Sequence, residues 1–314
     1  MKWMMVVTLL LRWSIVSSEA KPNWRPILRM KDLDDDASDK TYYFLGNSVT
    51  RSYAFTLCSM LSKIDYIPDR FIQRDLCGNS NFPHPGEVRA RGCRAQCGEN
   101  VSVVFGWKNT VSSHLSSDFR DVCEIPEDSN IPESSKFRRT LGCLRRIFRS
   151  ARANDVLVVG SLALDDRLFG ETHHLHFQHL DRFGELALRA TTHADLESII
   201  LMLRRAFPGN RVLWHSYPNL DFSRDTKGDC VRVRCDLMYA KINELVDASI
   251  RKLSVSMNVS FVSLWDIQAR RLDEYDDMIH HSGKLARDIM IKLLQWNQEC
   301  RASFLDPTCN DDDC

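Results

Sequence analysis

The sequence has no excess of charge of either sign, because 42 Lys and Arg residues balance 42 Asp and Glu residues. A chain without net charge has no overall field that would draw it to nucleic acid or to an anionic membrane surface. Internal repeats are also absent, and no second domain is visible among the 314 residues. We therefore expect no nucleic-acid partner, and partners must be inferred from individual sites.

Long hydrophobic runs are absent beyond the N-terminus, although a membrane-spanning helix needs about 20 apolar residues. The N-terminus has Lys2, an apolar run over residues 3–11, and small residues at Ser18 and Ala20. This arrangement is typical of a signal peptide, so we expect residues 1–20 to be removed. An uncleaved anchor is the weaker alternative. The mature chain is then secreted or lumenal, with no stable membrane insertion.

Paired CxxC motifs are missing as well, although the chain has 11 cysteines. So many cysteines are natural in an oxidising compartment, which predicts disulfides, with a structural zinc site as the minor alternative. The odd number leaves at least one thiol free or paired between chains, and we expect this to be Cys314 on the short acidic tail. The tripeptides at Asn100 and Asn258 are N-glycosylation sequons, which predicts a glycoprotein.

Strand-like and helix-like patterns alternate along the chain. We expect strands at Tyr42–Leu45, Val101–Trp107, Asp155–Leu164, Arg211–Ser216 and Val259–Ile267. We expect helices at Tyr53–Ile64, Lys136–Ala153, Leu196–Phe207, Leu237–Leu253 and Lys284–Cys300. This alternation predicts an α/β fold, a three-layer α/β/α sandwich around a parallel sheet of about five strands, with ligands at the carboxyl ends of the strands. Residues 21–314 are expected to form this single domain.

Two segments between these elements are predicted to be irregular. Residues 74–98 are rich in Cys, Gly, Pro and Arg without a clear period, which predicts a disulfide-pinned loop near the mouth of the site. Residues 125–135 form a second exposed connection.

Two clusters of side chains have open interpretations. For the histidines at 173, 174, 176 and 179, a polar loop that could line the cleft is a better interpretation than a metal site. For the basic residues of the expected helix at 136–153, a solvated outer face is a better interpretation than a binding site for an anionic glycan.

A possible nucleophile follows the first expected strand. Ser48 lies in Gly46-Asn47-Ser48, directly before a helical pattern, so it sits on a strand-to-helix turn. Glycine permits a tight turn, and the helix N-terminus supplies N–H groups and positive dipole to an oxyanion. A Gly-x-Ser at such a turn more often only caps the helix, so a catalytic interpretation needs a partner.

A possible partner for Ser48 lies near the C-terminus. Asp277 and His280 have DxxH spacing, which lets the carboxylate fix the imidazole tautomer while the other ring nitrogen faces a serine. The alternative is a polar loop with solvated histidines. His281 is a rival to His280, although the spacing favours His280.

Together these segments resemble the PC-esterase branch of the SGNH hydrolases, which includes GDSL and trichome-birefringence-like proteins. Residues 46–53 look like its first block, GDSxxR, and residues 155–161 look like its third-block strand. The next strand, the last strand and the acidic terminal block are matched by residues 212–218, 262–266 and 275–282. The resemblance rests on motif order over residues ~41 to ~295.

The resemblance implies an ester hydrolase that acts through Ser48, His280 and Asp277, often on acetyl esters of glycans, and it implies no cofactor and no metal. Arg51 is expected to brace the site or to contact substrate. Asn47 replaces the usual Asp, which is a mild departure. The third block supplies no side-chain amide for the oxyanion, and losing one such donor costs roughly 3 to 4 kcal/mol in a known hydrolase. Substitute donors are the N–H groups of Ser48, Gly160 and Gly106 and the hydroxyl of Ser161.

We therefore predict a secreted serine esterase that acts on acyl esters, with O-acetylated carbohydrate or another acylated small molecule as substrate. Two alternatives stay open: a glycan-binding protein with the SGNH fold and weak or absent catalysis, which the altered third block favours, and a glycan O-acetyltransferase.

Overall fold

A computed structural model describes residues 25–26, 40–62, 92–98, 100–107, 133–160, 182–209, 211–216, 218–219, 221–224, 246–276, 280–281 and 283–303. Residues 1–20, which are predicted to be a signal peptide, lie outside these residues, as do Asp277, Ser161, Cys314 and the histidines at 173–179.

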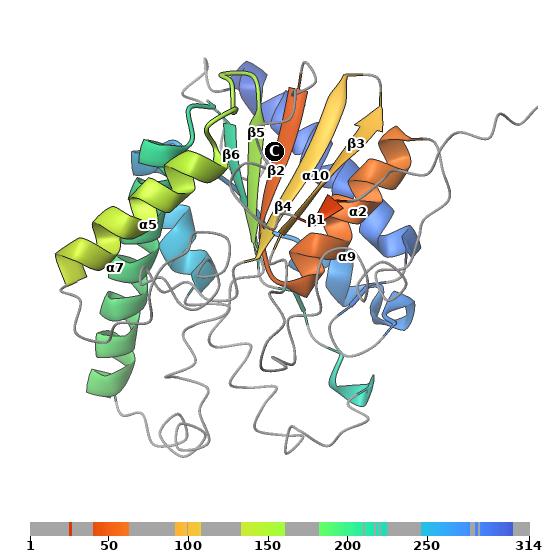
Figure 1. Cartoon of the computed structure of the whole chain (residues 1–314). Helices are drawn as coiled ribbons and strands as arrows, with labels where there is room; N and C mark the ends of the chain where they lie inside the picture. The colour runs from red at the N-terminus through yellow and green to blue at the C-terminus, as the bar shows by residue number, and fades with distance from the viewer. Residues whose placement is uncertain are drawn as a thin grey trace, which may run out of the picture.

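A seven-stranded sheet forms the centre of the molecule, in the order β1-β3-β4-β2-β5-β6-β7 (Figure 1). Its strands are β1 (Arg25–Pro26), β2 (Lys40–Gly46), β3 (Gly92–Gly98), β4 (Val101–Trp107), β5 (Val156–Gly160), β6 (Arg211–His215) and β7 (Ser260–Val262). Strands β4, β2, β5, β6 and β7 are parallel to their neighbours in this group, whereas β3 is antiparallel to β4 and β1 is antiparallel to β3. The prediction of about five parallel strands is confirmed.

The parallel strands have the order of a flavodoxin-like sheet. Numbered along the chain from β2, they run 2-1-3-4-5 across the sheet. In such sheets the chain leaves the first strand toward one edge and returns on its other side, so the connections diverge between β2 and β5. This switch point is where an open α/β sheet offers a crevice for a ligand.

Helices cover both faces of the sheet (Figure 1). One face packs against α5 (Glu133–Ile147), α7 (Arg182–Ala206) and helical residues 246–257; the other packs against α2 (Ser48–Leu61), α9 (Trp265–Ala269) and α10 (Gly283–Ser303). Alternation along β2 explains the two layers: Tyr43 and Leu45 join the first core, and Tyr42 and Phe44 join the second. The three-layer α/β/α prediction is confirmed. No helix in the described part of the chain is long and apolar enough to cross a membrane.

Two expectations about the elements were wrong. The end of the predicted Cys-rich loop, Gly92–Gly98, is strand β3, because it pairs along β4 even though its sequence has no apolar alternation. The run predicted as a strand to Ile267 stops at Val262, because α9 begins at Trp265. Short apolar runs do not distinguish a buried strand from a buried helix.

One disulfide ties α2 to the sheet, because Cys58 of α2 bonds Cys97 of β3 on the antiparallel side of the sheet. Cys143 of α5 is also disulfide-bonded. The prediction of disulfides is confirmed, and both sequon residues, Asn100 and Asn258, are exposed.

Candidate active site

The carboxyl ends of the five parallel strands lie in one row. Strand register aligns Trp107 with Gly46, Gly46 with Gly160, Gly160 with His215, and His215 with Val262. Gly46 and Gly160 are neighbours at the centre of this row, on the two strands that flank the switch point. The chain segment after Gly46 therefore begins at the switch point, which is where sheets of this order bind their ligands.

Ser48 is the first residue of α2 and follows this strand end after a single intervening residue. Asn47 caps the helix, because its Oδ1 accepts the Val49 N–H at 3.1 Å and its carbonyl accepts the Arg51 N–H at 3.0 Å. An amide oxygen accepts this bond as a carboxylate oxygen would, so Asn in place of Asp keeps the cap. Ser48 itself is half-buried at the positive end of a 14-residue helix.

Two glycines allow β2, β5 and α2 to approach closely. A Cβ on Gly46 would lie 2.2 Å from Thr50 Oγ1 and 2.3 Å from the Gly160 carbonyl oxygen. A Cβ on Gly160 would lie 2.1 Å from Nε2 of His215. A side chain at either position would overlap these atoms, so the close packing of the turn before Ser48 requires glycine at both positions.

Thr50 and His215 fill the space that these glycines leave. The Thr50 hydroxyl donates to the Gly160 carbonyl at 2.8 Å and lies 3.3 Å from His215 Nε2. His215 Nδ1 lies 2.9 Å from the Ser216 carbonyl, which can only accept, so the proton is on Nδ1 and Nε2 is an acceptor. Burial of the ring lowers the pKa of His215 to about 4. A neutral imidazole therefore lies directly beneath the turn that carries Ser48.

His215 lies in a segment that was predicted only as a strand, and no sequence motif assigned it to the site. Its signal was a polar residue at the end of an apolar strand. That signal does not identify its partner, because Thr50 lies 165 residues away in the chain.

A second buried histidine joins the C-terminal segment to α2. His281 stacks on Tyr53, with ring centroids 5.7 Å apart, and its Nδ1 lies 3.3 Å from the Tyr53 hydroxyl. Gln268 Oε1 accepts the Asn219 N–H at 3.0 Å, so the amide nitrogen of Gln268 faces His281 and donates to Nε2 at 3.2 Å. The remaining proton of a neutral His281 is then on Nδ1.

The two adjacent histidines have different surroundings. His281 is 1% exposed and has both ring nitrogens within hydrogen-bond distance of core side chains. His280 is half-buried, and its backbone carbonyl accepts the Asp276 N–H at 2.8 Å. Tyr275 pairs with His281 in an isolated bridge, which brings the two ends of the 275–281 loop together.

The loop is positioned beside the helix of Ser48. Its anchor, Tyr53, lies five residues after Ser48 on α2, which is a rise of about 7 Å along the helix. Tyr53 also contacts the His215 ring edge-on, with centroids 5.3 Å apart. Tyr53 therefore lies between the histidine of β6 and the C-terminal loop, and it brings them to the same helix.

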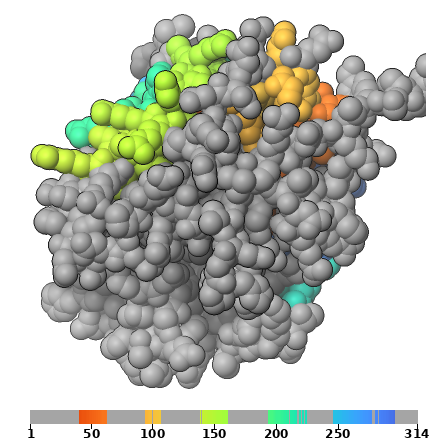
Figure 2. All heavy atoms as spheres, viewed as in Figure 1, coloured from red at the N-terminus to blue at the C-terminus, as the bar shows by residue number. Residues whose placement is uncertain are grey.

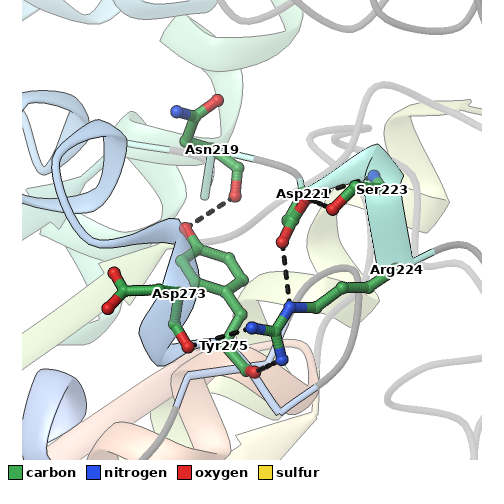
Figure 3. Close-up of polar contacts among 6 residues, drawn as sticks. All are labelled: Asn219, Asp221, Ser223, Arg224, Asp273 and Tyr275. Atoms are coloured by element: carbon green, nitrogen blue, oxygen red, sulfur yellow. Dashed lines mark hydrogen bonds and ion pairs between the residues drawn. The ribbon is translucent and has the colours of Figure 1, made fainter.

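An ion pair holds the other side of this loop (Figure 3). Arg224 bonds Asp221 at 2.9 Å, and its guanidinium donates to the backbone carbonyls of Asp273, at 2.9 Å, and Tyr275. The Tyr275 hydroxyl donates to the Asn219 carbonyl at 2.8 Å, and burial raises the pKa of this phenol. The segment that follows β6 thus fixes the loop that contains His280.

The remaining predicted residues lie as follows. Arg51 is buried, at 3% exposure, so it is not an ordinary surface arginine. Gly106 lies inside β4, paired with Leu45 on one side and Gly92 on the other, one register step before the strand end. Of the predicted catalytic residues, the structure describes Ser48 and His280, and Asp277 lies outside the described residues, as does Ser161.

Comparisons with known proteins give distant likenesses only. No protein-family model and no curated protein matches the sequence. Among solved structures, the chain is similar to an extracellular lipase from Streptomyces rimosus, with 10% identity and a TM-score of 0.38 over 82% of this chain and 98% of that one. It is also similar to a phospholipase A1 from Streptomyces albidoflavus, with 12% identity and a TM-score of 0.36 over 83% and 99%.

A third solved structure is a carbohydrate acetylesterase from Sinorhizobium meliloti, with 14% identity and a TM-score of 0.37 over 82% of this chain and 99% of that one. At these identities and TM-scores, the likenesses assign neither a family nor an activity to this chain. Membership of the PC-esterase branch stays a prediction.

Proposed function

We propose that this chain is a secreted serine ester hydrolase of the SGNH type, with Ser48 as its nucleophile. The observation that carries the proposal is the position of Ser48. It is the first residue of a helix, at the carboxyl end of β2, beside the switch point between β2 and β5. Nucleophile chemistry benefits from this position, because helix N–H groups and the helix dipole face a developing oxyanion.

In the proposed mechanism, Ser48 Oγ attacks the carbonyl carbon of an ester while His280 accepts its proton. The tetrahedral intermediate then expels the alcohol, which takes that proton from His280, and leaves an acyl-serine. Water attacks the acyl-serine with His280 again as the base, which releases the carboxylic acid and restores Ser48. Asp277 orients His280 and stabilises its cationic form.

His280 is supported as the base over its neighbour. His281 is buried, and Gln268 and Tyr53 already bond its two ring nitrogens. Taking a proton at Nε2 would require the loss of the Gln268 bond inside the core. His280 is half-buried on a loop that is anchored to the helix of Ser48.

The oxyanion would be bound by backbone groups around the first turn of α2. The Val49 N–H is already bonded to Asn47, so the Ser48 N–H is the helix donor we assign, with the Gly160 N–H and the Ser161 hydroxyl as further candidates and Gly106 as a more distant one. Thr50 bonds the Gly160 carbonyl, which fixes the orientation of the peptide that leads into residue 161. A fixed donor costs no reorganisation during the reaction.

The substrate class follows from the motif resemblance, which favours O-acetyl esters of carbohydrates. Disulfides at Cys58–Cys97 and at Cys143 support an oxidising compartment and thus secretion. The lack of a side-chain amide after Gly160 favours a second candidate, a glycan-binding protein with the same fold and little turnover. Transfer of the acyl group to a glycan hydroxyl instead of water would use the same acyl-serine.

The test is covalent labelling of the folded, secreted protein with a fluorophosphonate probe. We expect wild type to be labelled and Ser48→Ala and His280→Ala to lose labelling. Ser59→Ala is the matched control, since Ser59 is a buried serine on the same helix. Labelling is normalised to folded protein by near-ultraviolet circular dichroism.

Each outcome separates the candidates. Labelling that depends on Ser48 and His280 but not on Ser59 supports an activated serine, and acetylated glycans are then tested as substrates. Well-folded wild type that resists the probe contradicts the esterase and favours the binding protein. Labelled acetyl groups that reach an added glycan acceptor would indicate transfer.

A further inference from the structure

The outer face of α5 is strongly basic. Arg138, Arg145 and Arg146 of this helix and Arg149 in the turn after it are all exposed, and together they are called the α5 arginine face here. The yellow-green residues of this stretch lie at the visible surface in Figure 2. Because the whole chain has no net charge, the face is a local concentration of positive charge rather than part of a general excess.

Helical geometry places these arginines in a line. At about 100° per residue, positions 138 and 145 fall within about 20° of one another on α5, with 146 beside them. The rise from 138 to 146 is about 12 Å along the helix axis, and Arg149 follows in the turn after the helix. The opposite side of α5 packs into the core through Cys143, Leu144 and Ile147. Burial of the apolar side therefore holds the arginine face toward solvent in a fixed orientation.

Three of these arginines are not paired with a carboxylate in the described part of the chain: no described carboxylate bonds Arg138, Arg145 or Arg146. A solvated helix face usually carries both signs of charge in i,i+3 or i,i+4 pairs, as Arg271 and Glu274 do elsewhere in this chain. This one-sided charge is what favours a binding role for the face over a merely solvated one.

Gly142 lies in the middle of this face. A Cβ built on it meets nothing within 4 Å, so packing gives no reason for a glycine here. Glycine in a helix interior is less stable than alanine by roughly 1 kcal/mol. What glycine provides is a low point between Arg138 and Arg145 at which a ligand chain can approach the helix backbone.

We propose that the α5 arginine face binds a linear sulfated polysaccharide. Arginine forms two parallel hydrogen bonds to oxyanions such as sulfate, and a helical row of arginines about 12 Å long, continued by Arg149, matches several charged groups along one extended chain. Disulfides at Cys58–Cys97 and Cys143 favour an extracellular polyanion over nucleic acid. The face lies on the opposite side of the sheet from α2, so binding there does not require Ser48.

Binding of the full mature chain to heparin tests the proposal. We expect retention on a heparin column at about 0.15 M NaCl, an ionic strength that screens weak surface attraction. The triple variant R138S/R145S/R146S should elute earlier and bind heparin about tenfold or more weakly. The control R270S/K284S/R287S removes the same charge from exposed residues of the α9–α10 side and should keep wild-type affinity. Thermal unfolding of both variants checks that each is folded.

Three results would overturn the proposal. Wild type that is not retained at this salt concentration refutes a binding face. Equal weakening by the two triple variants shows that only net charge matters. The third result is that wild type binds duplex DNA, anionic lipid vesicles or desulfated heparin as tightly as heparin, and that R138S/R145S/R146S loses the same affinity for each. This result would show a general polyanion surface and not a sulfated-glycan site. Ser48→Ala should bind heparin as wild type does, so failure of the esterase proposal and failure of this one are distinguishable.

Discussion

The Thr50 hydroxyl offers a sharp test of how the site is held together. Replacement by valine keeps the shape of the side chain and removes the proton that Thr50 donates to the Gly160 carbonyl at 2.8 Å. It also removes the group that lies 3.3 Å from His215 Nε2. Thr50 is fully buried, so water cannot take its place. The single hydroxyl proton goes to the Gly160 carbonyl, and leaving one buried acceptor unsatisfied costs about 1 to 3 kcal/mol, so we expect Thr50→Val to lose about 1 to 3 kcal/mol of unfolding free energy.

Urea unfolding followed by circular dichroism measures this loss, with Thr56→Val as the control. Thr56 is also buried on α2, but its hydroxyl donates to the Ser52 carbonyl, which the Thr56 N–H already bonds within the helix. Thr56→Val therefore leaves no buried acceptor unsatisfied and should lower the unfolding free energy by less than about 1 kcal/mol. Thr50→Ser, which keeps the hydroxyl, should lose about as much as one buried methyl group, about 1 kcal/mol. Equal losses in the two valine variants, or a Thr50→Val loss below about 0.5 kcal/mol, would refute the reasoning.

Three further predictions concern the same scaffold. Because the folded pKa of His215 is about 4, below the ordinary 6.5, the unfolded chain takes up a proton first as pH falls. Unfolding free energy should therefore decrease from pH 6.5 to pH 4 by up to about 3 kcal/mol more in wild type than in His215→Gln; parallel urea midpoints for the two proteins would contradict this. Gly142→Ala should raise stability by about 1 kcal/mol, seen as a higher melting temperature, because open space surrounds the added methyl group. Gly160→Ala should destabilise by at least about 2 kcal/mol, since its Cβ would overlap the His215 ring; an unchanged melting temperature would show that the ring can move aside.

Local patterns in the sequence predicted the central elements well. Apolar runs located β2, β4, β5 and β6 closely, and Gly46-Asn47-Ser48 predicted the turn at which α2 begins, because Asn47 caps the helix there. Strand β3 could not be predicted this way, since Gly92–Gly98 has no apolar alternation and becomes a strand by pairing with β4. Helix α7 begins at Arg182, well before the predicted Leu196. The prediction missed its first half because polar residues such as Thr191 and Thr192 lie where an apolar face would be expected.

The contacts that assemble the candidate site are the least predictable part. Thr50 meets His215 across 165 residues of sequence, and Tyr53 meets His281 across 228. Neither distance leaves a periodic signal. The different surroundings of His280 and His281 likewise depend on Gln268, whose amide orientation is fixed by a backbone N–H at Asn219. Spacing alone favoured His280, and the buried contacts of His281 supply a physical reason.

The disulfide between α2 and β3 has a practical consequence for any experiment on this chain. Cys58 and Cys97 are 39 residues apart, and a chain-entropy calculation for a loop of that length gives a stabilisation of about 4 kcal/mol. A typical domain has only about 5 to 15 kcal/mol in total. Recombinant chains made in a reducing bacterial cytoplasm would lack this bond, and α2 and β3 would lose the covalent link that holds them together. Periplasmic or eukaryotic secretion is therefore the appropriate production route, and inactivity of cytoplasmic material would say nothing about catalysis.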